Sequence, residues 1–69
     1  MELTQRERET LSLITDAVLH RGFPPSVREL ATQIGCSPPT ALEYLRALEV
    51  KGHIERVPGS PRAIRIIHS

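Results

Sequence analysis

The sequence predicts an α+β fold in which three helices are followed by a two-stranded β-hairpin. Apolar residues recur at helical spacing in three segments, which glycines and prolines separate. After Gly52 the apolar period shortens to two, as in a strand. A chain of 69 residues has room for one small domain, which we expect to span residues 1–69.

The first helix is expected to begin at Thr4, because the stretch "TQRE" forms a capping box between Thr4 and Glu7. Gly22 suits its C-terminal end. The stretch "FPP" then forces an extended connector, since a proline disfavours helical geometry in the residue before it. Phe23, the only phenylalanine, is expected to close one end of the core. The apolar stripe of this helix consists of Leu11, Leu13, Ile14, Ala17 and Val18.

The second helix is short, and it begins with another capping box, Ser26 with Glu29. It is expected to end at Gly35. Only Cys36 separates this glycine from Ser37, and two helices joined by so tight a turn are typical of a helix-turn-helix. The side chains that face inward are Val27, Leu30, Ala31 and Ile34.

Two adjacent prolines begin the third helix. Ser37 is a good N-cap, and Pro38 takes the first helical position, where a missing N–H costs nothing and a fixed φ favours the helix. Pro39 takes the next position, whose N–H also has no intrahelical acceptor. The helix is expected to run to Lys51, with Gly52 as its C-terminal cap.

This third helix has an inward and an outward face. Ala41, Leu45 and Leu48 share the inward face, with Tyr44 at its edge. The outward face is of mixed character, and its residues are Pro39, Glu43, Arg46 and Val50, flanked by Thr40, Leu42 and Ala47.

The segment after Gly52 is predicted to form a β-hairpin. In "HIERV" the residues Ile54 and Val57 are expected in or near the core, and "PGSP" makes the turn. In "RAIRII" the residues Ile64 and Ile66 share one side, and Arg65 points to the other. Two strands alone are marginally stable, so the hairpin must pack on the helices. Three helices, a helix-turn-helix among them, and a terminal hairpin define a winged helix-turn-helix.

Several functional classes find no support in the composition. No apolar run approaches the roughly 20 residues of a membrane span, and the N-terminal stretch "MELTQRERE" is too charged for a signal peptide. A single cysteine, Cys36, suits a reducing compartment, so we expect a cytoplasmic protein. His20, His53 and His68 lack ligand spacing, and catalytic motifs are missing. We therefore expect no enzyme, no cofactor and no metal.

The distribution of charge favours a nucleic-acid partner more than the net charge of +1 does. Beyond Glu55 the sequence carries Arg56, Arg62 and Arg65 and no acidic residue, which suits contact with phosphates. The second helix of a helix-turn-helix enters the major groove, led by its N-terminal residues. We therefore expect double-stranded DNA as the partner. The candidate contacts are Arg28, Ser37, Pro39, Thr40, Leu42, Glu43, Arg46, Ser60, Arg62 and Arg65.

Several candidates also have a purely structural explanation. Ser37 can act only as a cap, and Arg62 and Arg65 can simply keep the strand soluble. Glu43 and Arg46, three residues apart, can form a surface ion pair of little energetic value.

The apolar part of the outward face, Pro39, Leu42 and Val50, keeps an alternative function open. The chain would then be a standalone winged-helix module that binds protein, or a small phage or mobile-element regulator acting on another repressor.

Four stretches, "LTQRERE", "GFPPSVRELA", "SPPTALEYLRALEVKGHIE" and "RAIRI", resemble the N-terminal DNA-binding domain of the LexA repressor family over nearly the whole chain. The resemblance implies an SOS-type transcriptional repressor that binds an inverted-repeat operator as a homodimer. It also implies that the start of the recognition helix reads the operator, through Ser37, Pro39, Thr40, Leu42 and Glu43.

The chain departs from the family in two respects. Pro39 and Leu42 stand where the best-known member has asparagine and glutamate, so two polar base-reading groups are replaced. The family's C-terminal half, which carries dimerisation and a serine–lysine self-cleavage dyad, has no counterpart in the sequence. Since the chain stops where the second wing strand should end, we expect a fragment cut at a domain boundary rather than a standalone relative.

Overall fold

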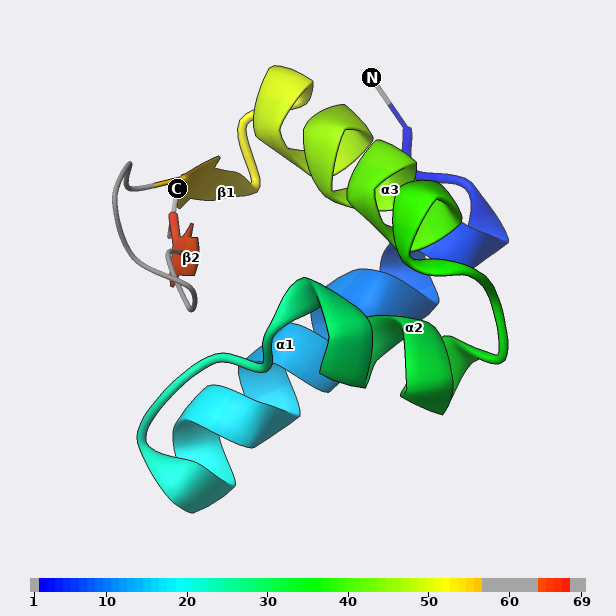
Figure 1. The fold of residues 1–69 in the computed structure, drawn as a ribbon. Helices are drawn as coiled ribbons and strands as arrows, with labels where there is room; N and C mark the ends of the chain where they lie inside the picture. Colours follow the sequence, from blue (N-terminus) through cyan, green and yellow to red (C-terminus); the bar gives the residue numbers. More distant parts are fainter. Residues whose placement is uncertain (1, 57–63, 68–69) are drawn as a thin grey trace.

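Three helices precede a two-stranded antiparallel hairpin, and the expected winged helix-turn-helix is confirmed (Figure 1). The computed structural model describes residues 2–56 and 64–67. The elements in chain order are α1 (Gln5–Arg21), α2 (Val27–Ile34), α3 (Pro38–Val50), β1 (Ile54–Arg56) and β2 (Ile64–Ile66).

Both expected capping boxes are present. At the start of α1 the Glu7 N–H donates to Thr4 Oγ1 over 3.2 Å, and the Thr4 N–H donates to Glu7 Oε1 over 2.9 Å. Ser26 and Glu29 exchange the same two bonds, of 3.2 and 3.0 Å, at the start of α2. These bonds satisfy amides that a helix N-terminus leaves without acceptors, and so they fix where each helix begins.

The end of α3 lies one residue earlier than expected. Lys51 is the C-cap and Gly52 follows it with a φ of 82°, a left-handed conformation that glycine adopts without strain. The His53 N–H donates to the Leu48 carbonyl over 2.9 Å, and the Gly52 N–H donates to the Glu49 carbonyl over 3.0 Å. This pair of bonds is a Schellman motif, and it turns the chain from α3 into β1.

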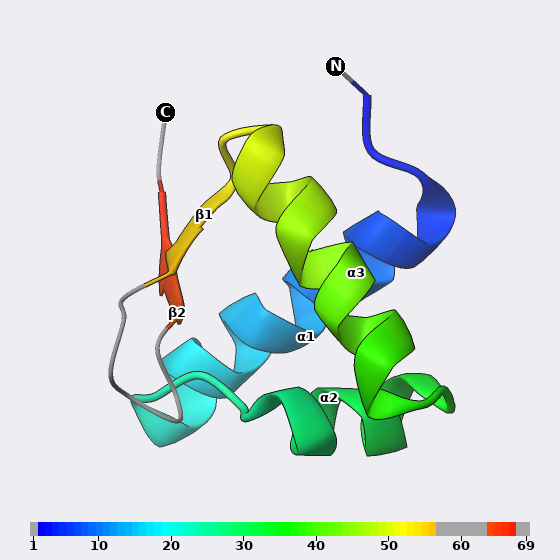
Figure 2. The ribbon, with the colours of Figure 1, turned by 45° about the horizontal axis from the view of Figure 1, so that its top comes forward.

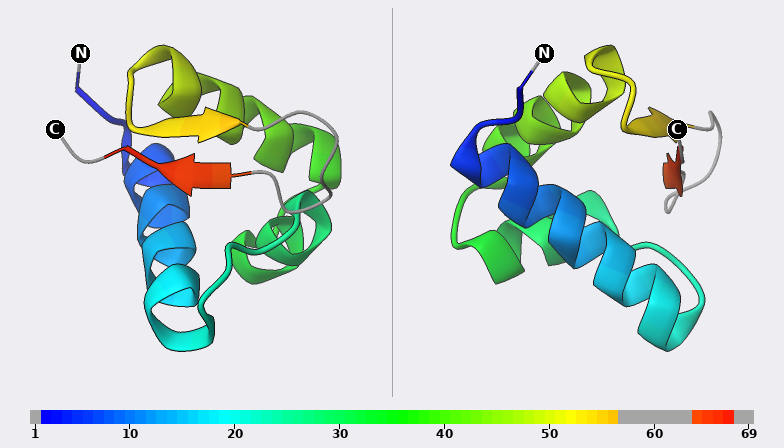
Figure 3. Two further views of the ribbon diagram at one scale, coloured as in Figure 1. Left: turned by 90° about the vertical axis from the view of Figure 1, so that its left-hand side faces the viewer. Right: turned by 180° about the vertical axis from the view of Figure 1, so that it is seen from behind.

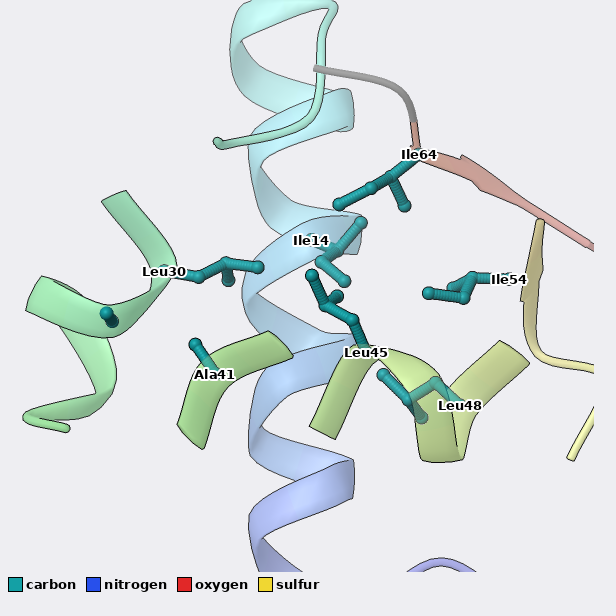
Figure 4. Packing of buried hydrophobic residues seen from close by; sticks show 8 residues of the cluster. Ile14, Leu30, Ala41, Leu45, Leu48, Ile54 and Ile64 are labelled. Atoms are coloured by element: carbon teal, nitrogen blue, oxygen red, sulfur yellow. The ribbon is translucent and has the colours of Figure 1, made fainter. Parts of the chain in front are cut away.

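The core lies where the three helices and the hairpin meet. In Figure 4 the side chains of Ile14, Leu45 and Ile54 point toward one another from α1, α3 and β1. The hairpin is therefore packed on the helices, which supplies the support that two strands need. Among the described residues, the buried core cluster consists of Ile14, Leu30, Ala31, Ala41, Leu45, Leu48, Ile54 and Ile64.

The two strands lie beside α3 and run in opposite directions across one side of the helices (Figures 2 and 3). Their register pairs Ile54 with Ile66, Glu55 with Arg65 and Arg56 with Ile64. Because side chains alternate between the faces of a strand, Ile64 and Ile54 turn to the core while Arg65 and Glu55 turn to solvent. The expected outward direction of Arg65 is confirmed.

The expectation for Phe23 is wrong. The residue is 41% exposed, and its ring lies under the Arg21 guanidinium, whose central carbon is 4.7 Å from the ring centroid. Pro25 is the residue of the connector that is fully buried. The extended geometry of two consecutive prolines brings the second of them inward and leaves the phenylalanine at the surface, where a cation stacks on its ring.

Candidate nucleic-acid interface

α3 presents an outward stripe of four residues at the helical spacing i, i+3, i+4 and i+7, namely Pro39, Leu42, Glu43 and Arg46. Three of them are exposed, and Leu42, at the flank, is half-buried. The opposite face of the helix is fully buried. The helix therefore has one side that holds it in the molecule and one that is available to a partner, as expected.

The first turn of α3 offers no backbone N–H to a ligand. Pro38 and Pro39 have none, and the Thr40 N–H donates to Ser37 Oγ over 3.4 Å. The Ala41 N–H donates to the Ser37 carbonyl over 3.0 Å. Helix N-termini often bind anions through free amides, but here the exposed residues are Ser37, Pro38 and Pro39. The Ser37 hydroxyl lies 3.0 Å from that of the half-buried Thr40.

Glu43 and Arg46 are exposed on α3, and in the described part of the chain they form no ion pair with each other or with a third residue. The surface pair that their spacing allows is therefore absent from this conformation. A carboxylate and a guanidinium, one helical turn apart, both stay available to an external partner.

Arg65 lies on the solvent side of the hairpin and is paired. Its Nη2 is 2.9 Å from Oε2 of Glu55, the residue opposite it in the register. Both side chains are largely exposed, so the pair adds little to stability and can open when a stronger anion approaches.

The remaining candidate DNA contacts, Arg28, Ser60 and Arg62, lie outside α3. Arg28 is exposed on α2, where its carbonyl accepts a 3.1 Å hydrogen bond from the Thr32 hydroxyl. Ser60 and Arg62 lie outside the described residues.

A tie between the end of α3 and the start of α1 was not expected from the sequence. Lys51 Nζ donates to Glu7 Oε1 over 2.6 Å and to the Glu2 carbonyl over 2.9 Å. The side chains of Lys51 and Glu7 are only 17% and 11% exposed. Hydrogen bonds from Lys51 and from the Thr4 N–H lower the pKa of Glu7. The two residues are 44 positions apart, so spacing alone gave no signal for the pair.

The family model of the LexA DNA binding domain matches residues 1–63. This chain belongs to the LexA DNA-binding domain family. It is 48% identical to the LexA repressor of Thermotoga maritima over 68 residues, which are 99% of this chain and 34% of the relative. It is 48% identical to the LexA repressor of Methylococcus capsulatus and 42% to that of Corynebacterium diphtheriae, over 94% of this chain and 33% and 28% of those relatives.

The resemblance that the sequence shows to the LexA family is thereby confirmed, and the chain spans about a third of the length of the LexA repressors it matches. Within residues 2–56 and 64–67 of this LexA-family chain, no three His, Cys, Asp or Glu side chains are grouped to hold a metal ion. No helix in the same residues is long and apolar enough to cross a membrane.

Proposed function

We propose that this LexA-family chain binds double-stranded DNA sequence-specifically, as the DNA-binding part of a transcriptional repressor. The observation that carries the proposal is the division of α3 into a fully buried face and an outward stripe, whose two charged residues form no ion pair within residues 2–56 and 64–67. The recognition helix of a helix-turn-helix lies in the major groove with its N-terminal residues at the base edges. Family membership supports the same placement of α3.

The outward stripe has suitable chemistry for reading bases. The Glu43 carboxylate can accept from cytosine N4, and the Arg46 guanidinium can donate to guanine O6 and N7 or to a phosphate. The Ser37 and Thr40 hydroxyls can bond to phosphates or bases, although Ser37 also caps the helix. Arg65 on the hairpin holds the DNA backbone. The remaining backbone contacts in this proposal are Arg28, Ser60 and Arg62.

The functional unit in this proposal is a homodimer on an inverted-repeat operator, acting in the cytoplasm in SOS-type regulation. One module buries limited surface against DNA, so a single copy binds a half-site weakly. Two copies related by a two-fold axis read two half-sites, and the operator symmetry mirrors that axis.

Selection of binding sites from a randomised duplex library, followed by titration, tests the proposal. The selected duplex and a scrambled duplex of equal composition are titrated at two salt concentrations with wild type, Arg46→Ala and Arg8→Ala. Arg8 is the matched control because it is exposed on α1, on the side opposite the buried Thr10. We expect Arg46→Ala to weaken binding and to reduce the salt slope by about one, and Arg8→Ala to do neither.

Equal affinity for the selected and the scrambled duplex would contradict the specificity. The alternative, a module that binds another protein, draws support from Val50, which is 76% exposed on α3. It requires that neither arginine variant changes the affinity for DNA or the salt slope, so the same titration decides between the two functions.

A further inference from the structure

The first turn of the recognition helix is devoid of charge. Between Glu29 and Glu43 the sequence contains no acidic or basic residue. The prolines at 38 and 39 have removed two amides, and Ser37 accepts the hydrogen bonds of the next two. The start of the outward stripe therefore consists of the exposed Pro39 ring and the half-buried Leu42 side chain.

Apolar groups at this place can recognise only one feature of the major groove. The polar edges of guanine, cytosine and adenine require a donor or an acceptor, and neither the Pro39 ring nor the Leu42 side chain has one. The thymine C5-methyl group is the apolar feature that the groove presents. We propose that Pro39 and Leu42 are specificity-determining residues that read thymine methyl groups, one turn before Glu43 and Arg46 read polar edges. This inference rests on the proposed function.

The geometry of α3 fits two neighbouring methyl groups. Residues three apart on a helix lie on one side and are separated by about 4.5 Å along its axis. Successive base pairs of duplex DNA are about 3.4 Å apart. Pro39 and Leu42 therefore face thymines at adjacent base pairs or at a spacing close to that. The Pro39 ring has a fixed φ and loses almost no conformational freedom on contact, so little entropy opposes its packing on a methyl group.

Replacement of thymine by uracil tests the inference, because it removes the C5-methyl group and leaves every base-pairing group in place. The selected duplex is resynthesised with uracil at one thymine position at a time and titrated with the wild-type chain. We expect the affinity to fall about threefold to fourfold per methyl group read, at one or two neighbouring positions of the half-site. Uracil elsewhere in the duplex should leave the affinity unchanged.

Variants then assign each methyl group to a residue. Each of the variants Pro39→Ala and Leu42→Ala should abolish the difference in affinity between the thymine and uracil duplexes at one position. The difference at the other position should persist. Arg46→Ala is the control, since it should weaken binding to both duplexes by the same factor and keep the difference. Circular dichroism checks that each variant is folded. If Leu42→Ala does not fold, Pro39→Ala decides alone, because its ring is exposed.

The outcomes separate this inference from the proposed function. A selected duplex that is bound specifically but tolerates uracil at every position would overturn the reading of methyl groups and leave DNA binding intact. A thymine–uracil difference that survives in both Pro39→Ala and Leu42→Ala would overturn the assignment to these residues. A selection that yields no preferred sequence would overturn both proposals.

Discussion

Lys51 at the end of α3 donates a 2.6 Å hydrogen bond to Glu7 at the start of α1. The same carboxylate oxygen accepts from the Thr4 N–H over 2.9 Å, and Lys51 also donates to the Glu2 carbonyl over 2.9 Å. Glu7, the partner of Thr4 in the capping box of α1, thus also holds α3. This polar tie therefore joins α3 to α1 in addition to the apolar core.

The interaction between Glu7 and Lys51 should be measurable with a double-mutant cycle. We expect Glu7→Gln and Lys51→Met each to lower the thermal midpoint, because each leaves a largely buried partner without its counter-charge. The thermal midpoint of the double variant should fall by less than the sum of the two single decreases, since each single variant already removes the same interaction. The exposed pair Arg6 and Glu9, with atoms 3.2 Å apart, is the matched control and should show almost no coupling. Strict additivity at Glu7 and Lys51 would show that the tie is not energetically significant.

Low pH should remove the contribution of the Glu7 carboxylate to the stability of the fold. Its pKa in the folded state is lowered from 4.5, mainly by the hydrogen bond from Lys51, so folding favours the carboxylate. The stability that this gives is present above the unfolded pKa and is lost as the pH falls through the lower, folded pKa. Urea denaturation from neutral pH downward should therefore show a steeper loss of unfolding free energy in wild type than in Glu7→Gln. Parallel curves would contradict the assignment of this acid sensitivity to Glu7.

The two faces of α3 should differ sharply in their tolerance of truncation. Leu45 is fully buried, and Leu45→Ala should reduce the free energy of unfolding by about 2–5 kcal/mol through lost burial and a residual cavity. Val50 lies on the same helix and is 76% exposed, so Val50→Ala should stay within about 0.5 kcal/mol of wild type. Chemical denaturation of both variants measures the contrast. A large decrease in the free energy of unfolding of Val50→Ala would mean that the Val50 side chain is covered by a second molecule.

Removal of the charge of Glu55 should strengthen DNA binding. Its carboxylate holds Arg65 at 2.9 Å and would also repel an approaching phosphate. We expect Glu55→Gln to raise the affinity by a factor of about two to five at low salt, the range typical of an exposed ion pair. Glu9→Gln removes the same charge from α1 and serves as the control. Equal effects of the two variants would mean that Arg65 does not reach the DNA backbone.

Features that depend on neighbouring residues could be predicted from the sequence. The capping boxes at Thr4 and Ser26 and the proline-led start of α3 follow from contacts three or four residues apart. The division of α3 into two faces follows from helical periodicity in the same way. These local signals were sufficient to predict the winged helix-turn-helix and the outward stripe.

Features that depend on distant residues could not be predicted in this way. The partner of Lys51 is set by how α1 and α3 pack, and the partner of Arg65 by the register of the hairpin. The exposure of Phe23 also depends on how the connector packs, since Pro25 and not Phe23 is its fully buried residue. Whether Glu43 and Arg46 pair with each other is a choice of rotamers that spacing permits but does not decide.

Because the interior makes no use of Glu43 or Arg46, single substitutions there should leave the folded state almost unaffected. Under the proposed function, a lineage that carries this domain can therefore acquire a new target site by one-step changes, without passing through unstable intermediates. Descendants that share nearly the same interior are then free to diverge in the genes they control.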